Sequence, residues 1–377
     1  MTLGSSKLFR PIKVGALTLN HRIVLAPMAR FKATETGHVP ILPIVKEFYT
    51  QRACDPGTLL ITEATIIARK AGVYKHCPGI WAEEQLQAWK EITDSVHAKG
   101  SYIYCQIWAL GRTADYNALW EEDPSLPYVA PSAIPLSGKD KVPRPITLEE
   151  IHEYIQLYAQ AAADAVNKAG FDGVEIHGAH GYLVDQFLQD VANKRTDGYG
   201  GSIENRARFG LEVINAVVKA VGAEKTAIRL SPWGITVSEV RMKDPIPTFS
   251  YFVSQIKEKH PDLSYIHVVE PRIDGGETRN PEDFSSNSSN DFLREIWAPR
   301  PYIAAGAFTR ETAIEAADEK GDIIAFGRHF ISNPDLTKRL KNNVPLTPYN
   351  RSTFYLSGNV AEGYLDYPFA SNVSNWA

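Results

Sequence analysis

Three side chains capable of acid–base chemistry follow the short apolar run Gly173–Ile176, namely His177, His180 and Tyr182. A run of this length is typical of a buried strand in a parallel sheet. In α/β proteins the loops at the carboxyl ends of such strands carry the chemistry. Two imidazoles that can donate hydrogen bonds, beside a phenol that can donate a proton, suit a developing oxyanion. His177 alone is equally well explained as a core histidine, but the group of three favours a catalytic site.

These side chains must be positioned by secondary structure, and apolar runs of strand length in the sequence predict the strands. The runs lie at Ile23–Ala29, Thr58–Ala64, Tyr102–Trp108, Gly173–Gly178, Ala227–Pro232, Tyr265–Glu270, Tyr302–Gly306 and Ile323–Arg328. Amphipathic segments of helical period separate most of them, at Glu83–Lys99, Thr147–Ala169, Ser202–Val221 and Thr309–Lys320. This alternation predicts an α/β fold, the (β/α)8 TIM barrel. A doubly wound sheet is the competing fold, but its G-x-G-x-x-G turn is absent.

Three further segments complete the predicted organisation. Weak alternation over Lys13–Asn20 predicts an N-terminal hairpin that leads into the core. A long loop insertion after the third strand, Ala109–Ile146, is expected to lie over the barrel as a lid. The polar stretch Pro271–Asn290 is expected to be mobile and, with the insertion, to shape the pocket. No boundary interrupts the chain, which predicts one domain over residues 1–377.

The composition is that of a soluble globular protein. The chain has 377 residues, of which 44% are hydrophobic and 22% charged, enough to build a large core. A net charge of −4 without blocks of like charge argues against nucleic acid or a membrane surface as partner. No run approaches the ~20 apolar residues that span a bilayer, and no signal peptide is evident. Three cysteines without C-x-x-C spacing indicate free thiols, so we expect a cytoplasmic protein. We also expect a monomer or homodimer that acts on a small molecule.

The residues at the ends of the predicted strands exclude two kinds of site. A catalytic zinc ion requires three protein ligands, and His177 and His180 supply only two, so we expect no metal. Among the residues at these strand ends, Glu175 with His177 is the only close carboxylate and imidazole pair. A Schiff-base aldolase requires a lysine within the barrel, and no predicted strand contains one.

The same strand ends suit a planar, polar and phosphorylated cofactor instead. Gly306 and the Gly327-Arg328 pair follow the seventh and eighth strands, where barrels commonly bind phosphate. Taken alone, the Gly327-Arg328 pair is explained more simply as a turn followed by a charged surface residue. Gln106 offers an amide to the pyrimidine edge of a flavin, and Arg229 offers a cation to its reducible end.

Taken together, these residues resemble the old yellow enzyme family of FMN-dependent ene-reductases. The most specific motifs are His177-Gly178-Ala179-His180-Gly181-Tyr182-Leu183 and Gly200-Gly201-Ser202-Ile203-Glu204-Asn205-Arg206. The resemblance extends from Leu8-Phe9-Arg10-Pro11 to Glu362-Gly363-Tyr364-Leu365-Asp366-Tyr367-Pro368, nearly the whole chain. In detail it is greatest for fungal members, including those of ergot-alkaloid pathways that act on chanoclavine aldehyde. It implies that residues 1–377 form one FMN-binding TIM-barrel domain.

The resemblance also implies a role for each site residue. FMN is expected against Pro27, Met28, Ala29, Ala64, Gln106, His177 and Arg229, with its phosphate at Ala305, Gly306, Gly327 and Arg328. The substrate is expected against Tyr74, Trp108, His177, His180, Phe354 and Tyr355. The catalytic residues are expected to be His177 and His180, which grip the carbonyl oxygen, and Tyr182, which donates the proton.

The implied reaction is a ping-pong cycle, in fungal secondary metabolism. NADPH reduces FMN and leaves, and an α,β-unsaturated aldehyde or ketone takes its place. The histidine pair polarises the carbonyl, hydride passes from flavin N5 to Cβ, and Tyr182 protonates Cα. Many members have threonine or cysteine where this chain has Ala29, and alanine cannot donate a hydrogen bond to the flavin. We therefore expect an altered flavin potential.

Three other functions remain open at this point. A flavin-dependent isomerase or oxidase of a biosynthetic pathway would use the same cofactor for other chemistry. A non-catalytic flavin-binding protein would not be reduced by NADPH. A metal-dependent hydrolase on the same barrel lacks the necessary ligands.

Overall fold

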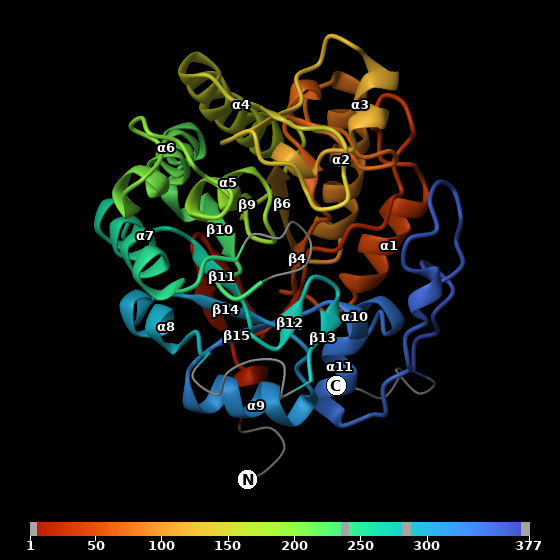
Figure 1. The fold of residues 1–377 in the computed structure, drawn as a ribbon. Helices are drawn as coiled ribbons and strands as arrows, with labels where there is room; N and C mark the ends of the chain where they lie inside the picture. The colour runs from red at the N-terminus through yellow and green to blue at the C-terminus, as the bar shows by residue number, and fades with distance from the viewer. Residues whose placement is uncertain (1–5, 235–240, 281–287, 371–377) are drawn as a thin grey trace.

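The centre of the protein is a closed barrel of parallel strands (Figure 1). The computed structural model describes residues 6–234, 241–280 and 288–370. Around the barrel the strand order is β4, β3, β15, β14, β11, β10, β9 and β6, and β6 pairs with β4 to close the ring. Their bounds are β3 Ile23–Leu25, β4 Leu59–Ile61, β6 Tyr102–Trp108, β9 Gly173–Gly178, β10 Thr226–Leu230, β11 Tyr265–Val269, β14 Tyr302–Ala305 and β15 Ile323–Phe326. Each predicted run contributes one strand, so the predicted (β/α)8 TIM barrel is confirmed.

Several strands are shorter than the sequence predicts. The first ends at Leu25, because Pro27 has no N–H group with which to continue the ladder. The second ends at Ile61, and a separate short strand, β5 (Thr65–Ile66), then pairs with the end of β6. The chain between the strand ends and the following helices is thus irregular, and it is this backbone that surrounds the barrel mouth.

The four predicted helices are present with nearly the predicted bounds. They are α2 Glu83–His97, α4 Leu148–Asn167, α6 Ile203–Val221 and α9 Arg310–Glu319. Thr147 and Glu150 form a capping box at the start of α4, in which the threonine hydroxyl accepts from the Glu150 N–H and the glutamate accepts from the Thr147 N–H. Ser202 caps α6 in the same position. None of the described helices is both long and apolar enough to cross a membrane.

Within the described ranges, seven more helices are present that the sequence interpretation did not specify. They are α1 Ile44–Arg52, α3 Tyr116–Glu122, α5 Leu183–Leu188, α7 Ile246–Lys259, α8 Asp291–Trp297, α10 Arg328–Ser332 and α11 Leu336–Asn342. Short 3-10 turns lie at Lys7–Phe9, Arg69–Ala71, Gly111–Thr113, Ala223–Lys225 and Arg351–Thr353. Most of these elements are too short to show a helical period. The exception is α7, whose buried Phe249, Phe252, Val253 and Ile256 repeat at helical spacing and were a usable signal.

The predicted N-terminal hairpin closes one end of the barrel. β1 (Ile12–Val14) and β2 (Leu17–Leu19) pair antiparallel. Val14 and Leu19 are fully buried and pack in one cluster with the apolar residues of the barrel interior, such as Leu59 and Ile303. With this end filled by side chains, the mouth at the carboxyl ends of the strands is the end left for chemistry.

The insertion after the third strand is present, but its expected role as a lid is wrong. It contains α3 and a small parallel pair, β7 (Val129–Ala130) with β8 (Arg144–Pro145). Ala118 and Leu119 of α3 pack with Val73 in a separate apolar cluster. Figure 1 shows α3 at the periphery, above α2 in this view. Because the insertion buries its own apolar side chains beside the barrel, it lines no part of the cavity described below.

An ordered hairpin after β11, and not the insertion, lies in front of the barrel mouth (Figure 1). β12 (Ile273–Asp274) and β13 (Glu277–Thr278) pair antiparallel around Gly275 and Gly276. This part of the predicted mobile stretch is a defined turn, whereas residues 281–287 of the same prediction lie outside the described residues. The Asp-Gly-Gly-Glu sequence is a recognised signal for a two-residue hairpin loop, so the sequence contained this information.

Candidate active site

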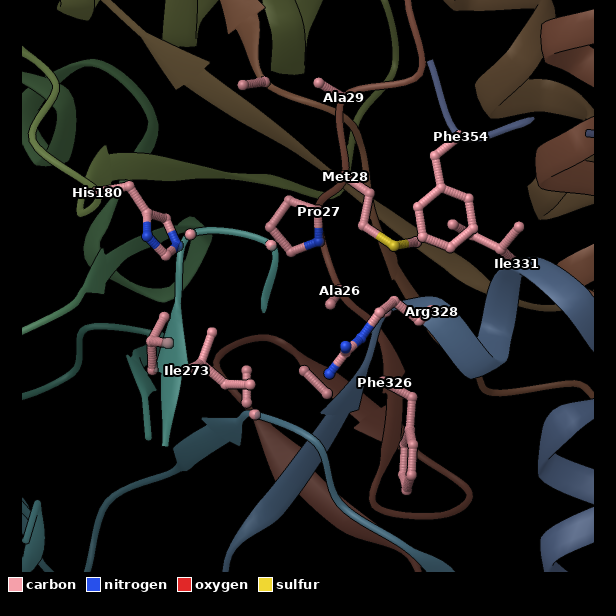
Figure 2. Close-up of a pocket in the computed structure, with 18 of the residues that line it drawn as sticks. Ala26, Pro27, Met28, Ala29, His180, Ile273, Phe326, Arg328, Ile331 and Phe354 are labelled. Carbon is pink, nitrogen blue, oxygen red and sulfur yellow. The ribbon is translucent and has the colours of Figure 1, made fainter. Parts of the chain in front are cut away.

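A cavity of about 760 Å³ opens at the carboxyl ends of the barrel strands. Every residue that the sequence predicts for the cofactor, the substrate or catalysis lines this cavity: Pro27, Met28, Ala29, Ala64, Tyr74, Gln106, Trp108, His177, His180, Tyr182, Arg229, Ala305, Gly306, Gly327, Arg328, Phe354 and Tyr355. Figure 2 shows Arg328 extending into the cavity below Met28, with His180 on the opposite wall. Residues separated by hundreds of positions in the chain therefore meet at one site, while their individual roles remain predictions.

The turn that carries the predicted catalytic residues is held by hydrogen bonds from three directions. His180 has a left-handed backbone with φ +55°, which is unfavourable for a residue other than glycine. Its N–H donates to Ser231 Oγ at 2.7 Å, and the next N–H, of Gly181, donates to Asp185 Oδ2 at 2.8 Å. The Gln186 amide donates to the Gly181 carbonyl at 2.8 Å. These bonds offset the cost of the turn and fix the directions of the side chains beside it.

An aromatic cluster packs around His177 and Tyr182. The rings of His177 and Tyr182 meet edge to face with centroids 4.8 Å apart, and Trp108 meets Tyr182 in the same way at 4.4 Å. Trp108 also stacks on His177 at 5.8 Å. Edge-to-face and offset contacts are the favourable arrangements of such rings. The Tyr182 phenol and the His177 imidazole therefore have few alternative rotamers.

Burial sets the protonation states of these groups. Burial lowers the pKa of His177 well below its ordinary value, and nearby His180 and Arg229 lower it further. Burial likewise lowers the pKa of His180 to about 3. For Tyr182, burial raises the pKa well above its ordinary value. At neutral pH the site consequently holds two neutral imidazoles and one protonated phenol.

The tautomer of His177 follows from its own backbone. Its Nδ1 accepts a hydrogen bond from the Ala179 N–H at 3.4 Å, so the proton of the neutral ring resides on Nε2. His177 is thus a donor toward the cavity. Glu175 and His177 are close in the sequence, but their side chains do not form a hydrogen bond with each other. The Glu175 carboxylate instead accepts from His267 Nδ1 at 2.8 Å.

One wall of the cavity presents buried donors that no described residue satisfies. Arg229 Nε and Trp108 Nε1 are buried and have no hydrogen-bond partner within the described ranges. An unpaired buried donor is costly in a folded protein. The Gln106 amide nitrogen donates to Glu175 Oε1 at 2.7 Å, which leaves the amide oxygen for a ligand. This wall therefore suits a polar planar group with its own acceptors and donors.

Two glycines shape the other end of the cavity. A side chain at Gly306, which has φ +142°, would place its Cβ 2.9 Å from Glu270 Cβ and Ile273 Cγ1. A Cβ at Gly327 would lie 3.0 Å from Met28 Sδ. Only glycine lets the backbone of both strand ends approach the cavity so closely. Arg328, the first residue of α10, adds a positive charge there and donates to Thr278 Oγ1 at 2.7 Å.

Two buried cations that the sequence interpretation missed join the C-terminal segment to this site. Arg30 donates from Nε to the Phe354 carbonyl and from Nη2 to the Gly363 carbonyl. Lys32 donates to the carbonyls of Leu356 and Val360. These contacts hold Phe354 at the edge of the cavity. No local pattern reveals them, since each acceptor lies more than three hundred residues away in the chain.

Other cavity residues were also missed, among them Phe31, Ile273, Thr278, Phe308, Phe326, His329, Tyr349 and Arg351. Ile273 and Thr278 belong to the β12–β13 hairpin, and the Asp-Gly-Gly-Glu signal could have located them. Phe326 lies within the predicted eighth strand, and the others lie outside any sequence pattern that we recognised. Within the described residues, no group of three histidine, cysteine, aspartate or glutamate side chains could hold a metal ion.

Comparison with known proteins identifies the family. A model of the NADH:flavin oxidoreductase / NADH oxidase family matches residues 7–347. The chain is 50% identical to chanoclavine-I aldehyde reductase fgaOx3 of Penicillium roqueforti, with 97% of each chain covered. It is 47% identical to the NADP-dependent oxidoreductase lnbE of Aspergillus flavus, again over 97% of each. It is 45% identical to the probable inactive reductase easA of Epichloe festucae var. lolii, over 98% of this chain and 96% of that one.

Solved structures agree with this assignment. The old yellow enzyme of Pichia sp. is similar in structure with a TM-score of 0.87 and 40% identity, over 98% of this chain and 95% of that one. The chain belongs to the old yellow enzyme family of FMN-dependent oxidoreductases, as its motifs predict.

The observed cavity fits FMN. A flavin ring offers acceptors to the unpartnered Arg229 Nε and a ring N–H to the Gln106 oxygen. A phosphate suits the backbone at Gly306 and Gly327 together with the Arg328 guanidinium. FMN carries both kinds of group in one molecule, and both parts of the cavity are continuous.

The neutral state of the imidazoles predicts a specific pH dependence. Because burial lowers the pKa of His180 to about 3, this imidazole stays neutral from about pH 5 to about pH 8, and His180→Asn should lower kcat/KM for an enal without changing the shape of its pH profile. Burial raises the pKa of Asp185 to about 7, so a break near that pH is expected to persist in both proteins. A break in the wild type that is absent from His180→Asn would show instead that this imidazole titrates.

Proposed function

We propose that this protein is an NADPH-dependent ene-reductase that reduces the activated C=C bond of α,β-unsaturated aldehydes or ketones. The observation that carries the proposal is the shared cavity. Two neutral imidazole donors and a protonated phenol face the same space as the wall that fits a flavin. Acceptance of hydride at Cβ of an enal places negative charge on the carbonyl oxygen and requires a proton at Cα. The site offers groups for both needs.

His177 and His180 are proposed to bind the carbonyl oxygen. Their ring centroids lie 5.9 Å apart with the planes nearly perpendicular, so two N–H groups can converge on one oxygen. Because the rings are neutral, they act as hydrogen-bond donors and do not transfer a full proton. Donors fixed in place before the reaction stabilise the developing oxyanion, and the loss of one typically costs ~10²–10³ in rate.

Tyr182 is proposed to protonate Cα. Its raised pKa keeps the proton on the phenol until a strongly basic carbon develops beside it. Edge-to-face contacts with Trp108 and His177 fix the direction of its ring. A positioned general acid of this kind contributes ~10²–10⁴ in rate.

The remaining contacts are proposed to place cofactor and substrate. Bound FMN supplies the hydride, which it receives from NADPH. The NADP-dependent oxidoreductase among the relatives supports NADPH as reductant. Gln106 and Arg229 would orient the ring, while Gly306, Gly327 and Arg328 would hold the phosphate. Tyr74, Phe354 and Tyr355 would bound the substrate space.

A non-catalytic flavoprotein is the second candidate. The relative described as a probable inactive reductase, 45% identical to this chain, favours it. The presence of Tyr182 and both histidines in one cavity favours the active enzyme. A flavin-dependent isomerase or oxidase would use the same groups without net consumption of reductant.

The first test is a visible spectrum of the purified protein, followed by anaerobic addition of NADPH. We expect a bound oxidised-flavin spectrum that bleaches with NADPH and returns when cyclohexenone or cinnamaldehyde is added. Bleaching without return on any enone would favour the isomerase or oxidase. A flavin that NADPH does not bleach would indicate the non-catalytic protein.

Tyr182→Phe tests the proposed proton donor. Loss of the phenol should slow reoxidation by the enal by about 10²–10⁴-fold and leave reduction by NADPH largely intact, because only the first of these steps requires a proton at Cα. Stopped-flow absorbance separates the two half-reactions. Tyr74→Phe is the matched control, since the Tyr74 hydroxyl donates to the Thr113 carbonyl. Equal losses in both half-reactions of Tyr182→Phe would contradict the role.

Ala29→Thr tests the proposed influence of Ala29 on the flavin. A hydroxyl near the ring could donate to it and stabilise the reduced anion, so the midpoint potential should become more positive. Ala29→Val is the control, because valine has the shape of threonine without its hydroxyl. A potential that is the same in all three proteins would refute the idea.

A further inference from the structure

A buried carboxylate lies behind the cavity wall that fits the flavin, and the reaction described above does not use it. Glu175, in the middle of β9, is fully buried and does not line the cavity. Its Oε1 accepts from the Gln106 amide at 2.7 Å, and its Oε2 accepts from His267 Nδ1 at 2.8 Å. All three side chains are at most 1% exposed. A buried ionisable group in such a place requires a physical reason.

Glu175 carries the negative charge of this cluster. Burial raises its pKa, but His267 and Arg229 outweigh burial and hold the pKa below its ordinary value. Burial lowers the pKa of His267, and its Nε2 has no partner among the described residues. His267 is therefore a neutral ring that donates from Nδ1, although its distance from Glu175 is that of an ion pair. The carboxylate stays ionised and the imidazole does not.

This carboxylate decides which end of the Gln106 amide meets a ligand. An ionised carboxylate only accepts hydrogen bonds, so it must face the amide nitrogen. The opposite orientation would place two oxygens against each other. The amide oxygen is thereby left for the cavity, where it can accept from a ring N–H. A neutral group in place of Glu175 would allow both orientations.

The same carboxylate also balances the charge of Arg229. Arg229 lies on β10, next to β9, and is buried. No described carboxylate forms an ion pair with it, and Glu175 is the largest source of negative potential at its guanidinium. The positive charge of Arg229 in the wall and the negative charge of Glu175 behind it are therefore close together and not screened by water.

We propose that Glu175 is a positioning residue that fixes the orientation of Gln106 and offsets the charge of Arg229, and so holds the reduction potential of bound FMN below the value that Arg229 alone would set. The inference rests on the proposed placement of Gln106 and Arg229 against the flavin ring. Reduced flavin is anionic in such sites, and the positive charge of Arg229 favours that form. Removal of the nearby negative charge therefore makes the flavin easier to reduce.

Glu175→Gln is the direct test, because it removes the charge and keeps the size of the side chain. The midpoint potential of bound FMN, measured anaerobically against a reference dye, should become more positive by at least a tenfold change in the two-electron equilibrium, which is about 30 mV. Glu175→Asp keeps the charge and should leave the potential near that of the wild type, even where FMN dissociates more readily. His267→Gln removes a partner of the carboxylate but not the charge, and should also leave the potential near the wild-type value.

Two results would overturn the proposal. One is an unchanged potential in FMN-loaded Glu175→Gln. The other is an equal shift in Glu175→Gln and Glu175→Asp, which would mean that geometry and not charge is responsible.

A second measurement covers the case in which Glu175→Gln retains no flavin. Removal of one member of a buried charge pair leaves the other uncompensated, so the double variant Glu175→Gln/Arg229→Met should have a higher Tm than Glu175→Gln. Additive losses of Tm would contradict the coupling. Neither measurement uses an enone, so a failure of the ene-reductase proposal would be recognised separately by the turnover test.

Discussion

Closure of the barrel is the constraint on which the rest of this structure depends. The pairing of β6 with β4 joins the first and last members of the strand order and leaves no free edge in the ring. Because all strands are parallel, their carboxyl ends meet at one rim. Side chains as distant in sequence as Met28, Trp108 and Arg328 therefore line a single cavity. The N-terminal hairpin fills the opposite end with Val14 and Leu19, so the interior has one accessible mouth.

Burial then determines the chemistry that this rim can perform. Away from water, charged forms are disfavoured, so His177 and His180 are neutral donors and Tyr182 keeps its proton. The one carboxylate that remains ionised behind the wall, Glu175, does so because two donors and Arg229 favour its charge. The same low-dielectric environment thus prevents ionisation at the catalytic turn and strengthens the effect of the buried charges of Glu175 and Arg229 on each other.

The geometry of the site is fixed by polar groups that take no part in the proposed reaction. Asp185, Gln186 and Ser231 hold the left-handed turn at His180. On the other side, Arg30 and Lys32 bind carbonyl groups of the C-terminal segment and keep Phe354 at the rim. Buried hydrogen bonds compensate for the backbone strain at His180. They also compensate for the cost of ordering the C-terminal segment against the barrel mouth.

The sequence by itself determined the barrel, its eight strands, the main helices and the side chains at the strand ends, whereas Tyr74, Phe354 and Tyr355 were expected only from the family resemblance. It could do so because these features are local: apolar runs, helical period, the Thr147 capping box and glycines at strand ends. It located the hairpin at Gly275 and Gly276 only as an irregular stretch, although the turn signal was present. It assigned the insertion a place over the mouth, whereas packing against Val73 keeps α3 at the side.

Only the tertiary structure decided that Glu175 pairs with His267 and Gln106, that Arg30 and Lys32 hold the C-terminal segment, and that the imidazoles are neutral. Each of these depends on distance through space and on exclusion of water, which neighbouring positions in a sequence do not specify.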